Sequence, residues 1–427
     1  MENRNEDNII KRLINNVWKG LLILVGGIVF GFVALALVHL IPVDKMYQNV
    51  AASRDVINSH AQIVTGYTST TIDNFTDSIM LNEAICDIDT GLIDKVVNNY
   101  QVNYWKGYDQ QENLFRYLDG EEGYRYQGYS HYWGGHQVFI KLMLLLGDYS
   151  DILILNTIVQ FLLVIMIIIR LQKMGKGYAV LPFCITIASM MPVAIALCMQ
   201  LCTVYYVMLF GILMLIRKYE KSPHSDMCYV FLIIGMATSY VDFLTYPFVS
   251  LGIPLVIWLI LDNEEKVIQK LGKMVWNSGF WCAGYVGMWA GKWILGSILL
   301  PEAGSLKAAL ESISYRGSNK TTDGVITLWD VIMKNAYVYL RKPILIVVIC
   351  MIVYYLCKMI VNKNLKLNII SNIFPFLIVA CYPLIWYRIA ENHSYEHVFM
   401  TYRELAIGMF AGMCICAILA RESKGQI

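Results

Sequence analysis

Charged residues are scarce in this 427-residue chain, at 15% of the total, whereas hydrophobic residues make up 57% and the mean hydropathy is +0.52. This balance excludes an ordinary soluble enzyme of the same length and indicates an all-α polytopic membrane protein. The formal net charge of +2 identifies no class of charged partner, and no nucleic-acid partner is expected.

Cysteine pairs and the common sequence motifs are also missing. Of the 11 cysteines only Cys86 lies in a large predicted external loop, so no disulfide framework is expected. The sequence contains no CxxC pair, P-loop, GxGxxG, HExxH, heptad run or internal repeat. These absences remove the usual signals for nucleotide binding, zinc binding and coiled coils.

Long apolar stretches are abundant. The hydrocarbon core of a membrane is about 30 Å thick and needs about 20 apolar residues per helix, because unpaired backbone groups are not tolerated there. Stretches of this kind begin near Leu21, Ile152, Tyr178, Thr203, Met227, Pro247, Met274, Ile344, Ile369 and Leu405. The sequence therefore predicts about ten transmembrane helices.

Lysine and arginine gather in alternate connections between these stretches. Basic residues in short connections resist translocation, so those connections are expected to stay in the cytoplasm. The residues concerned are Arg4, Lys11, Arg12, Lys19, Arg170, Lys173, Lys176, Arg217, Lys218, Lys221, Lys266, Lys270, Lys273, Lys358, Lys363, Lys366, Arg421 and Lys424. Their alternation predicts a multi-pass plasma membrane protein with both termini in the cytoplasm, and the first stretch is expected to remain as a signal anchor.

The predicted organisation has two large extracytoplasmic segments. The expected divisions are a cytoplasmic tail at 1–20, the first transmembrane helix at 21–40, an extracytoplasmic loop with an interfacial helix at 41–150, transmembrane helices two to seven at 151–299, a second extracytoplasmic loop at 300–342, and helices eight to ten with a short cytoplasmic tail at 343–427.

Helices are expected within both loops. The apolar segment from Gly134 to Gly147 is too short to span, and it fits an interfacial helix with His136 and Lys141 among the headgroups. In the second loop, helical spacing of apolar residues predicts one helix through Leu306, Leu310 and Ile313 and another from Trp329 to Leu340.

Two aspartates of the first loop are candidates for acid–base or metal chemistry. Asp73 and Asp77 are four residues apart, so a helical turn would point both carboxylates the same way. On irregular backbone they could still surround one hydroxyl or one divalent cation, Mg²⁺ or Mn²⁺. External loops are rich in carboxylates, so a solvated or structural role is the commoner alternative.

Asp242 and Lys292 are charges near membrane depth, where an unpaired charge is costly. Asp242 ends one span, and it is either a site carboxylate or a cap of the helix that begins at Pro247. Lys292 lies between Trp289 and Trp293, and it either extends to the outer interface or faces the bundle and binds a phosphate.

A polar stretch near the C-terminus contains two histidines and an arginine. His393 and His397 are four residues apart and share one helical face, although such a pair without a third ligand is usually no metal site. Tyr402 and Arg403 follow at the start of the last span. The Arg403 guanidinium could bind a lipid headgroup nonspecifically or, inside a cavity, grip a substrate phosphate.

Aromatic residues are dense in the second half of the first loop. Their side chains could stack on sugar rings or anchor the loop at the membrane interface, which is the commoner role. The residues are Tyr104, Trp105, Tyr129, Tyr132 and Trp133.

This layout of one span, a long external loop with an early acidic motif, an interfacial helix and many closely linked spans resembles the GT-C superfamily of integral membrane glycosyltransferases. The resemblance covers the architecture of nearly the whole chain. The stretches from His131 to His136 and from His393 to Arg403 are similar to segments of uncharacterised bacterial relatives from surface-polysaccharide gene clusters. The resemblance implies a GT-C-like fold and transfer of a sugar from a polyprenyl-phosphate donor to an extracytoplasmic glycan, lipid or protein acceptor.

The resemblance also implies roles for the residues singled out above. A first-loop carboxylate would act on the acceptor or on a metal, and fixed cations would neutralise the leaving phosphate among membrane lipids. The expected catalytic residues are Asp77, Asp73 and Asp242. The expected substrate- and phosphate-binding residues are Lys292, His393, His397, Tyr402, Arg403, His131, Trp133 and His136.

Two other functions compete with this hypothesis. A surface-polysaccharide polymerase or ligase usually has its large external loop late in the chain, whereas here the large loop comes first. A transporter or lipid flippase is expected to have broken helices, charges near the midplane and paired halves, and the sequence has no internal duplication.

Overall fold

The computed structural model describes residues 2–58, 61–105, 107–223, 225–262, 264, 266–303, 305–361 and 369–422. Three of the basic residues used to predict the orientation, Lys363, Lys366 and Lys424, lie outside these ranges.

Helices make up most of the described chain, and 3-10 helices carry the label η. One long helix and a set of short elements come first: α1 (Glu2–His39), α2 (Asp44–Ala52), α3 (Arg54–Ile57), η1 (Thr68–Thr70), α4 (Asn74–Ile85), α5 (Leu92–Asn98), β1 (Gln101–Asn103), α6 (Gln110–Leu118), β2 (Arg125–Gln127) and α7 (Gln137–Leu146). Longer helices follow: α8 (Tyr149–Lys173), η2 (Gly177–Ala179), α9 (Val180–Ser189), α10 (Pro192–Ala196), α11 (Met199–Lys221), α12 (Cys228–Val241), α13 (Val249–Leu261) and α14 (Val267–Leu299). The last part contains η3 (Pro301–Ala303), α15 (Ser305–Arg316), β3 (Lys320–Thr321), β4 (Gly324–Val325), α16 (Leu328–Tyr339), α17 (Lys342–Val361), α18 (Ile369–Ala380), α19 (Tyr382–Ile389), α20 (Glu391–Glu396), α21 (Val398–Thr401), η4 (Tyr402–Leu405) and α22 (Ala406–Glu422).

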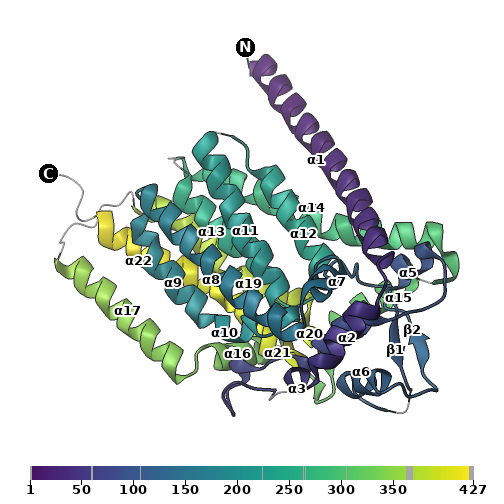
Figure 1. The fold of residues 1–427 in the computed structure, drawn as a ribbon. Coiled ribbons are helices and arrows are strands. Elements are labelled where there is room, and N and C mark those ends of the chain that lie inside the picture. Colours follow the sequence, from purple (N-terminus) through teal and green to yellow (C-terminus); the bar gives the residue numbers. More distant parts are fainter. Residues whose placement is uncertain are drawn as a thin grey trace.

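The long helices form a bundle, and the short elements gather at one end of it (Figure 1). We call this end, where α2, α4, α7, α20 and η4 lie, the loop end. Helix α13 lies at the centre, and all of its residues are buried because its sequence is apolar around its whole circumference. Helices α1 and α17 lie at the edges and expose large apolar side chains, such as Phe30 and Ile360. Apolar surface of this extent is suited to a lipid environment.

Among the described residues, five helices are long and apolar enough to cross a membrane. They are Leu13–His39, Tyr149–Lys173, Met199–Lys221, Pro343–Ile360 and Val398–Ala420. Each of the other predicted spans also lies on helical backbone, in shorter apolar helices or in the 33-residue helix α14. The all-α prediction is confirmed, and the count of about ten spans stays a prediction.

Helices α12 and α14 pack against each other at backbone distance. A Cβ atom on Gly235 would lie 2.1 Å from the Trp281 carbonyl oxygen, and one on Gly284 would lie 2.2 Å from that of Leu232. Small residues permit this approach, as they do between helices in membranes. The contact fixes the rotation of α14 and therefore the direction in which its aromatic side chains point.

The predicted helix between Gly134 and Gly147 is present as α7 (Gln137–Leu146), but its lysine, Lys141, does not lie at the surface as expected. Lys141 is buried, and its Nζ donates to the Ala84 carbonyl oxygen at 2.7 Å. The ring of His136 is also buried, beside Glu83. The placement of both side chains among headgroups was therefore wrong, because short elements of the first loop cover that face of α7.

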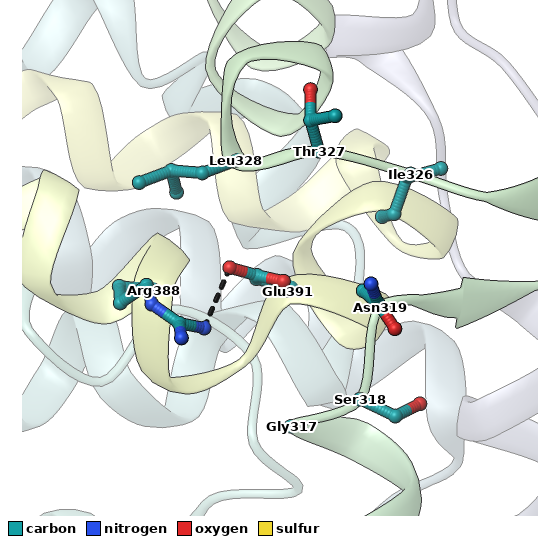
Figure 2. Close-up of a pocket in the computed structure, with 8 residues that line it drawn as sticks. All are labelled: Gly317, Ser318, Asn319, Ile326, Thr327, Leu328, Arg388 and Glu391. Atoms are coloured by element: carbon teal, nitrogen blue, oxygen red, sulfur yellow. Dashed lines mark hydrogen bonds and ion pairs between the residues drawn. The ribbon is translucent and has the colours of Figure 1, made fainter.

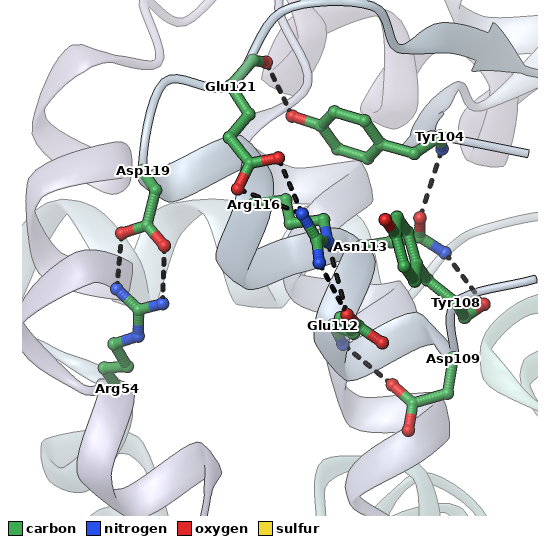
Figure 3. Close-up of polar contacts among 9 residues, drawn as sticks. All are labelled: Arg54, Tyr104, Tyr108, Asp109, Glu112, Asn113, Arg116, Asp119 and Glu121. Atoms are coloured by element: carbon green, nitrogen blue, oxygen red, sulfur yellow. Dashed lines mark hydrogen bonds and ion pairs between the residues drawn. The ribbon is translucent and has the colours of Figure 1, made fainter. Parts of the chain in front are cut away.

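The first loop folds into a lobe beside α2, in which β1 and β2 pair antiparallel and α6 packs below them (Figure 1). Ion pairs at the surface hold α6 in this lobe (Figure 3). Two guanidinium nitrogens of Arg54 donate to the two carboxylate oxygens of Asp119. Arg116 pairs with Glu112 at 2.8 Å and with Glu121 at 2.7 Å. Such exposed pairs contribute little to stability. The Arg54–Asp119 pair connects α3 to the end of α6, whereas both pairs of Arg116 lie within α6 and the turn that follows it.

In the second loop both predicted helices are present. The apolar pattern through Leu306, Leu310 and Ile313 lies on α15, and the stretch from Trp329 lies on α16. Helix α16 begins with a capping box, in which Thr327 and Asp330 bond each other's backbone amides.

Candidate functional site

Four aromatic side chains follow one face of α14 toward the loop end. Trp281, Tyr285, Trp289 and Trp293 are spaced four residues apart, so they lie one above the other on the helix. The centroids of successive rings are 5.0, 5.6 and 5.5 Å apart. Three of these residues, Tyr285, Trp289 and Trp293, line a cavity.

This cavity, which we call the aromatic cavity, has a volume of about 230 Å³. It lies between α14, α15 and α19, and His131 and Tyr132 of the first loop line it as well. Two of its apolar lining residues, Val286 and Ile389, are 63% and 57% exposed. The cavity therefore reaches the apolar outer surface of the bundle.

Several polar atoms in the wall of the aromatic cavity have no partner. The Tyr285 hydroxyl and the indole nitrogens of Trp289 and Trp386 are buried without a hydrogen bond to any described residue. A buried donor without a partner costs about 1–3 kcal/mol. Three such donors around one cavity indicate a site for a ligand that carries acceptor oxygens.

Arg316 supplies the positive charge of this cavity from the last residue of α15. Its Nη1 donates to Nδ1 of His393 at 2.6 Å. Within the described chain the guanidinium has no carboxylate partner in ion-pair range and makes no other hydrogen bond. The remaining N–H groups of Arg316 are therefore free to bind an anion.

His393 holds Arg316 in place as a neutral imidazole. A guanidinium can only donate, so Nδ1 accepts from Arg316, and Nε2 must carry the hydrogen that it donates to the Leu244 carbonyl oxygen. Burial, followed by His397 and Arg316, holds the pKa of His393 well below its usual range. Burial and Arg316 likewise lower the pKa of His131 to about 4. At neutral pH the only charge that these groups bring to the cavity is that of Arg316.

The carbonyl that His393 contacts belongs to a strained turn. Leu244 has φ +67°, in the left-handed region that a leucine seldom adopts. Asp242 stabilises this turn, since its carboxylate accepts from the amide and the hydroxyl of Thr245. The cap reading of Asp242 thus fits its contacts, although the segment it caps is the turn before α13. Asp242 acts on the cavity through Leu244, His393 and Arg316.

A second, more polar hollow lies on the other side of the α19–α20 junction and has a volume of about 480 Å³. We call it the polar pocket. Figure 2 shows the Glu391 carboxylate facing Arg388, and their oxygen and nitrogen are 2.8 Å apart. The two hollows share Gly317 and lie against alternate residues of one segment, with Ile389 in one and Arg388 in the other.

Asp77 and Asp73 have structural positions in α4 and line neither hollow. The Asp77 carboxylate accepts from the amides of Met199 and Gln200 at 2.8 and 2.9 Å and from the hydroxyl of Tyr149. It therefore caps the first turn of α11. Burial raises the pKa of Asp77 to about 6, and these three bonds oppose the rise. Asp73 is the N-cap of α4, as its carboxylate accepts from the amide and the hydroxyl of the same threonine.

No metal site forms around these acids. Within the described ranges, no group of three His, Cys, Asp or Glu side chains is placed to hold a metal ion. Both carboxylates are occupied by donors of the chain itself, so a Mg²⁺ or Mn²⁺ ion at Asp73 and Asp77, one of the alternatives that the sequence left open, does not fit the residues present.

Two further predicted residues, Lys292 and Trp133, hold the first loop to the bundle, and a third, His136, makes a contact within the first loop. Lys292 is buried rather than extended to the interface, and its Nζ donates to the Val96 carbonyl oxygen at 2.9 Å. Trp133 donates to the Met288 carbonyl oxygen at 2.7 Å. His136 lies 3.1 Å from Glu83. Of the two alternatives for Lys292, the one in which it faces the bundle agrees with the structure. Its partner is a backbone oxygen of the first loop and not a phosphate.

Tyr402 and Arg403 connect the closing stretch to other segments at the loop end. The Tyr402 hydroxyl donates to the Ser69 carbonyl oxygen, and Arg403 Nε donates to that of Met190 at 2.9 Å. Arg403 also donates to Phe399, and it lines neither hollow. The first loop and the C-terminal stretch therefore meet, as expected, but through backbone contacts and not around Asp77.

Sequence reasoning missed Arg316 and Glu391. A signal for Arg316 was present, because Ala309 and Ser312 precede it at spacings of seven and four on one face of α15 and leave room beside a cation. Another was the four-residue repeat of aromatics on α14. His131 and Tyr132 are the predicted residues whose placement in the aromatic cavity agrees with a binding role.

Comparison with known proteins adds no relative. The chain matches no family model, no curated protein and no solved structure.

Proposed function

We propose that this protein is a membrane glycosyltransferase that takes a sugar from a polyprenyl-phosphate donor and places it on an acceptor at the loop end. The observation that carries the proposal is Arg316, a cation that has no counterion among the described residues and lies at an aromatic cavity that reaches the apolar surface of the bundle. A polyprenyl-phosphate sugar combines the three matching chemistries: an apolar tail, one anionic phosphate and a sugar face.

Each part of the donor has a complement in the aromatic cavity. The phosphate would bind the free N–H groups of Arg316, and the unpaired donors of Tyr285 and Trp386 would bond oxygens of the phosphate or sugar. Aromatic faces suit the apolar side of a sugar ring. The prenyl chain would leave the cavity past Val286 and Ile389 into lipid.

The chemistry follows from the charge of Arg316. When the bond between the sugar and the phosphate breaks, negative charge grows on the leaving phosphate. A cation fixed beforehand by His393 stabilises that charge without having to reorganise.

The proposed topology places the loop end outside the cytoplasm in a multi-pass plasma membrane protein of about ten spans, with both termini inside. The basic residues of α8, α11 and α14 support it, because Arg170, Lys218 and Lys266 all lie at the bundle end opposite the loop end. The acceptor would then approach from outside.

Sugar transfer by the purified protein tests the proposal. Reconstituted in vesicles with the loop end outward, it is expected to release polyprenyl phosphate from at least one member of a panel of polyprenyl-phosphate hexoses and pentoses when acceptor glycans are supplied outside. Vesicles with the protein heat-denatured are the control. Failure across the panel, with intact protein and both orientations present, would end the transferase proposal.

The pH dependence of donor binding follows from the charges in the cavity. Farnesyl methyl phosphate, a phosphodiester with one negative charge, is expected to bind with constant affinity from pH 7 to 9, because His131 and His393 are neutral there. A bound anion offsets the charge of Arg316 and raises the pKa of His131. Affinity should therefore increase only as the pH falls toward 5. Quenching of tryptophan fluorescence reports the binding, and a steep loss of affinity between pH 6 and 8 would contradict the neutral state.

A further inference from the structure

The two hollows described above are separated by one short piece of backbone. Residues 388 to 391 run between them, with Ile389 and Ala390 toward the aromatic cavity and Arg388 and Glu391 toward the polar pocket. Gly317, which follows Arg316, borders both. Molecules bound in the two hollows would therefore approach each other at Gly317, where the two linings meet.

Glu391 has a free oxygen in the polar pocket. The residue is only 6% exposed, and Oε1 is paired with Arg388. Among the described residues no hydrogen bond reaches Oε2. A buried carboxylate oxygen that lines a pocket and has no partner in the chain is placed to accept a hydrogen bond from a ligand.

The other candidate carboxylates lack such an oxygen. Both oxygens of Asp73, Asp77 and Asp242 accept hydrogen bonds from the chain itself. Glu83 and Glu404 each have an unpaired buried oxygen, but neither residue lines the polar pocket or the aromatic cavity. Glu391 is therefore the acid with a free oxygen at the junction of the hollows.

The lining of the polar pocket selects a polyhydroxylated ligand. Arg388 offers donors, Glu391 offers an acceptor, and the side-chain amide of Asn319 can do both (Figure 2). None of the described residues that line this pocket is aromatic, in contrast to the aromatic cavity. The ion pair leaves no net charge for a charged ligand.

We propose that the polar pocket is the acceptor site for a sugar hydroxyl and that Glu391 is the general base, because its free carboxylate oxygen lies in a pocket that shares Gly317 with the cavity that contains Arg316. This inference rests on the proposed function. The acceptor oxygen forms a bond to the anomeric carbon while the bond from that carbon to the phosphate oxygen breaks. The hydroxyl proton passes to Glu391, and the electron pair leaves on the phosphate beside Arg316. The product sugar has inverted configuration.

Two variants of the polar pocket test the two roles separately, the general base at Glu391 and the binding of the acceptor by Arg388. Glu391→Gln keeps the shape of the side chain and is expected to lower transfer by about 10²–10⁴-fold, while the affinity for farnesyl methyl phosphate stays within about twofold. Arg388→Leu is expected to abolish binding of methyl glycosides, measured by saturation-transfer NMR with methyl α-D-glucoside, methyl α-D-galactoside and methyl α-D-mannoside. Glu311→Gln, an exposed glutamate on α15, is the matched control and should behave as the wild type.

The possible results distinguish failure of the roles assigned to Glu391 and the polar pocket from failure of the proposed glycosyltransferase function. Normal transfer by Glu391→Gln would contradict the role of Glu391 as general base. Glycoside signals that are equal in the wild type and in Arg388→Leu would contradict the role of the polar pocket as acceptor site. If no donor in the panel supports transfer, the proposed function and the base role fail together. Loss of glycoside binding in Arg388→Leu would still support a site for hydroxylated ligands. A Glu391→Gln protein that loses farnesyl methyl phosphate binding would show a damaged donor cavity and would overturn the role assigned to Glu391.

Discussion

Replacing Arg316 with alanine is expected to lower sugar transfer by about 10²–10³-fold, because Arg316 is the one positive charge that the described residues place in the cavity to oppose the leaving phosphate. The same change should weaken binding of farnesyl methyl phosphate by at least tenfold, since Arg316 has no other anion to bind in the described structure. Both effects are measured on protein in vesicles, by product release and by quenching of the tryptophans that line the cavity.

The matched control for Arg316 is Lys307, which lies on the same helix with its side chain 86% exposed. Lys307→Ala removes an equal charge from α15 and should leave transfer and probe binding unchanged. Arg316→Lys should recover only part of the activity, because an ammonium cannot bond His393 and a phosphate in one planar fork. Full activity of Arg316→Ala would show that the reaction does not take place in the aromatic cavity.

Replacing Asp77 with alanine is expected to destabilise the protein far more than it slows the chemistry. The change leaves the amides of Met199 and Gln200 and the hydroxyl of Tyr149 buried without an acceptor. With about 1–3 kcal/mol for each unpaired donor, the cost is of the order of 3 kcal/mol or more. The midpoint of thermal unfolding, followed with a thiol-reactive dye in detergent, should fall clearly.

Asp73→Ala provides the comparison, because an N-cap removed from α4 costs about 1 kcal/mol and should lower the midpoint less. The folded fraction of Asp77→Ala, isolated at low temperature, should keep its turnover within a few-fold. A variant with the wild-type unfolding midpoint and no turnover would return Asp77 to the catalytic role that the resemblance first implied.

The sequence predicted the helices well because their signals are local. Apolar spacing on α15 and α16 and the long apolar runs can be read from neighbouring residues. The roles of charged residues could not be read in this way, since their partners are remote in sequence. Asp77 bonds amides more than 120 residues away, and Lys292 bonds Val96 across 196 residues.

The candidate site shows the same division. His131 and His393 were singled out, and the structure places one in the aromatic cavity and the other behind its cation. Arg316 and Glu391 were not. The small residues before Arg316 on α15 are a local signal, but nothing near either residue in sequence indicates that α15 and the α19–α20 junction meet. The strained turn at Leu244, which aims a carbonyl at His393, has no sequence signal either.

The sideways opening of the aromatic cavity, past Val286 and Ile389, decides how such an enzyme would meet its substrate. A donor that never leaves the bilayer arrives by diffusion in two dimensions, and the spent carrier departs along the same plane. Saturation would then depend on the number of donor molecules per lipid molecule and not on molarity in the surrounding solution. Adding inert lipid at a fixed total amount of donor would lower the donor-to-lipid ratio and therefore the rate of transfer.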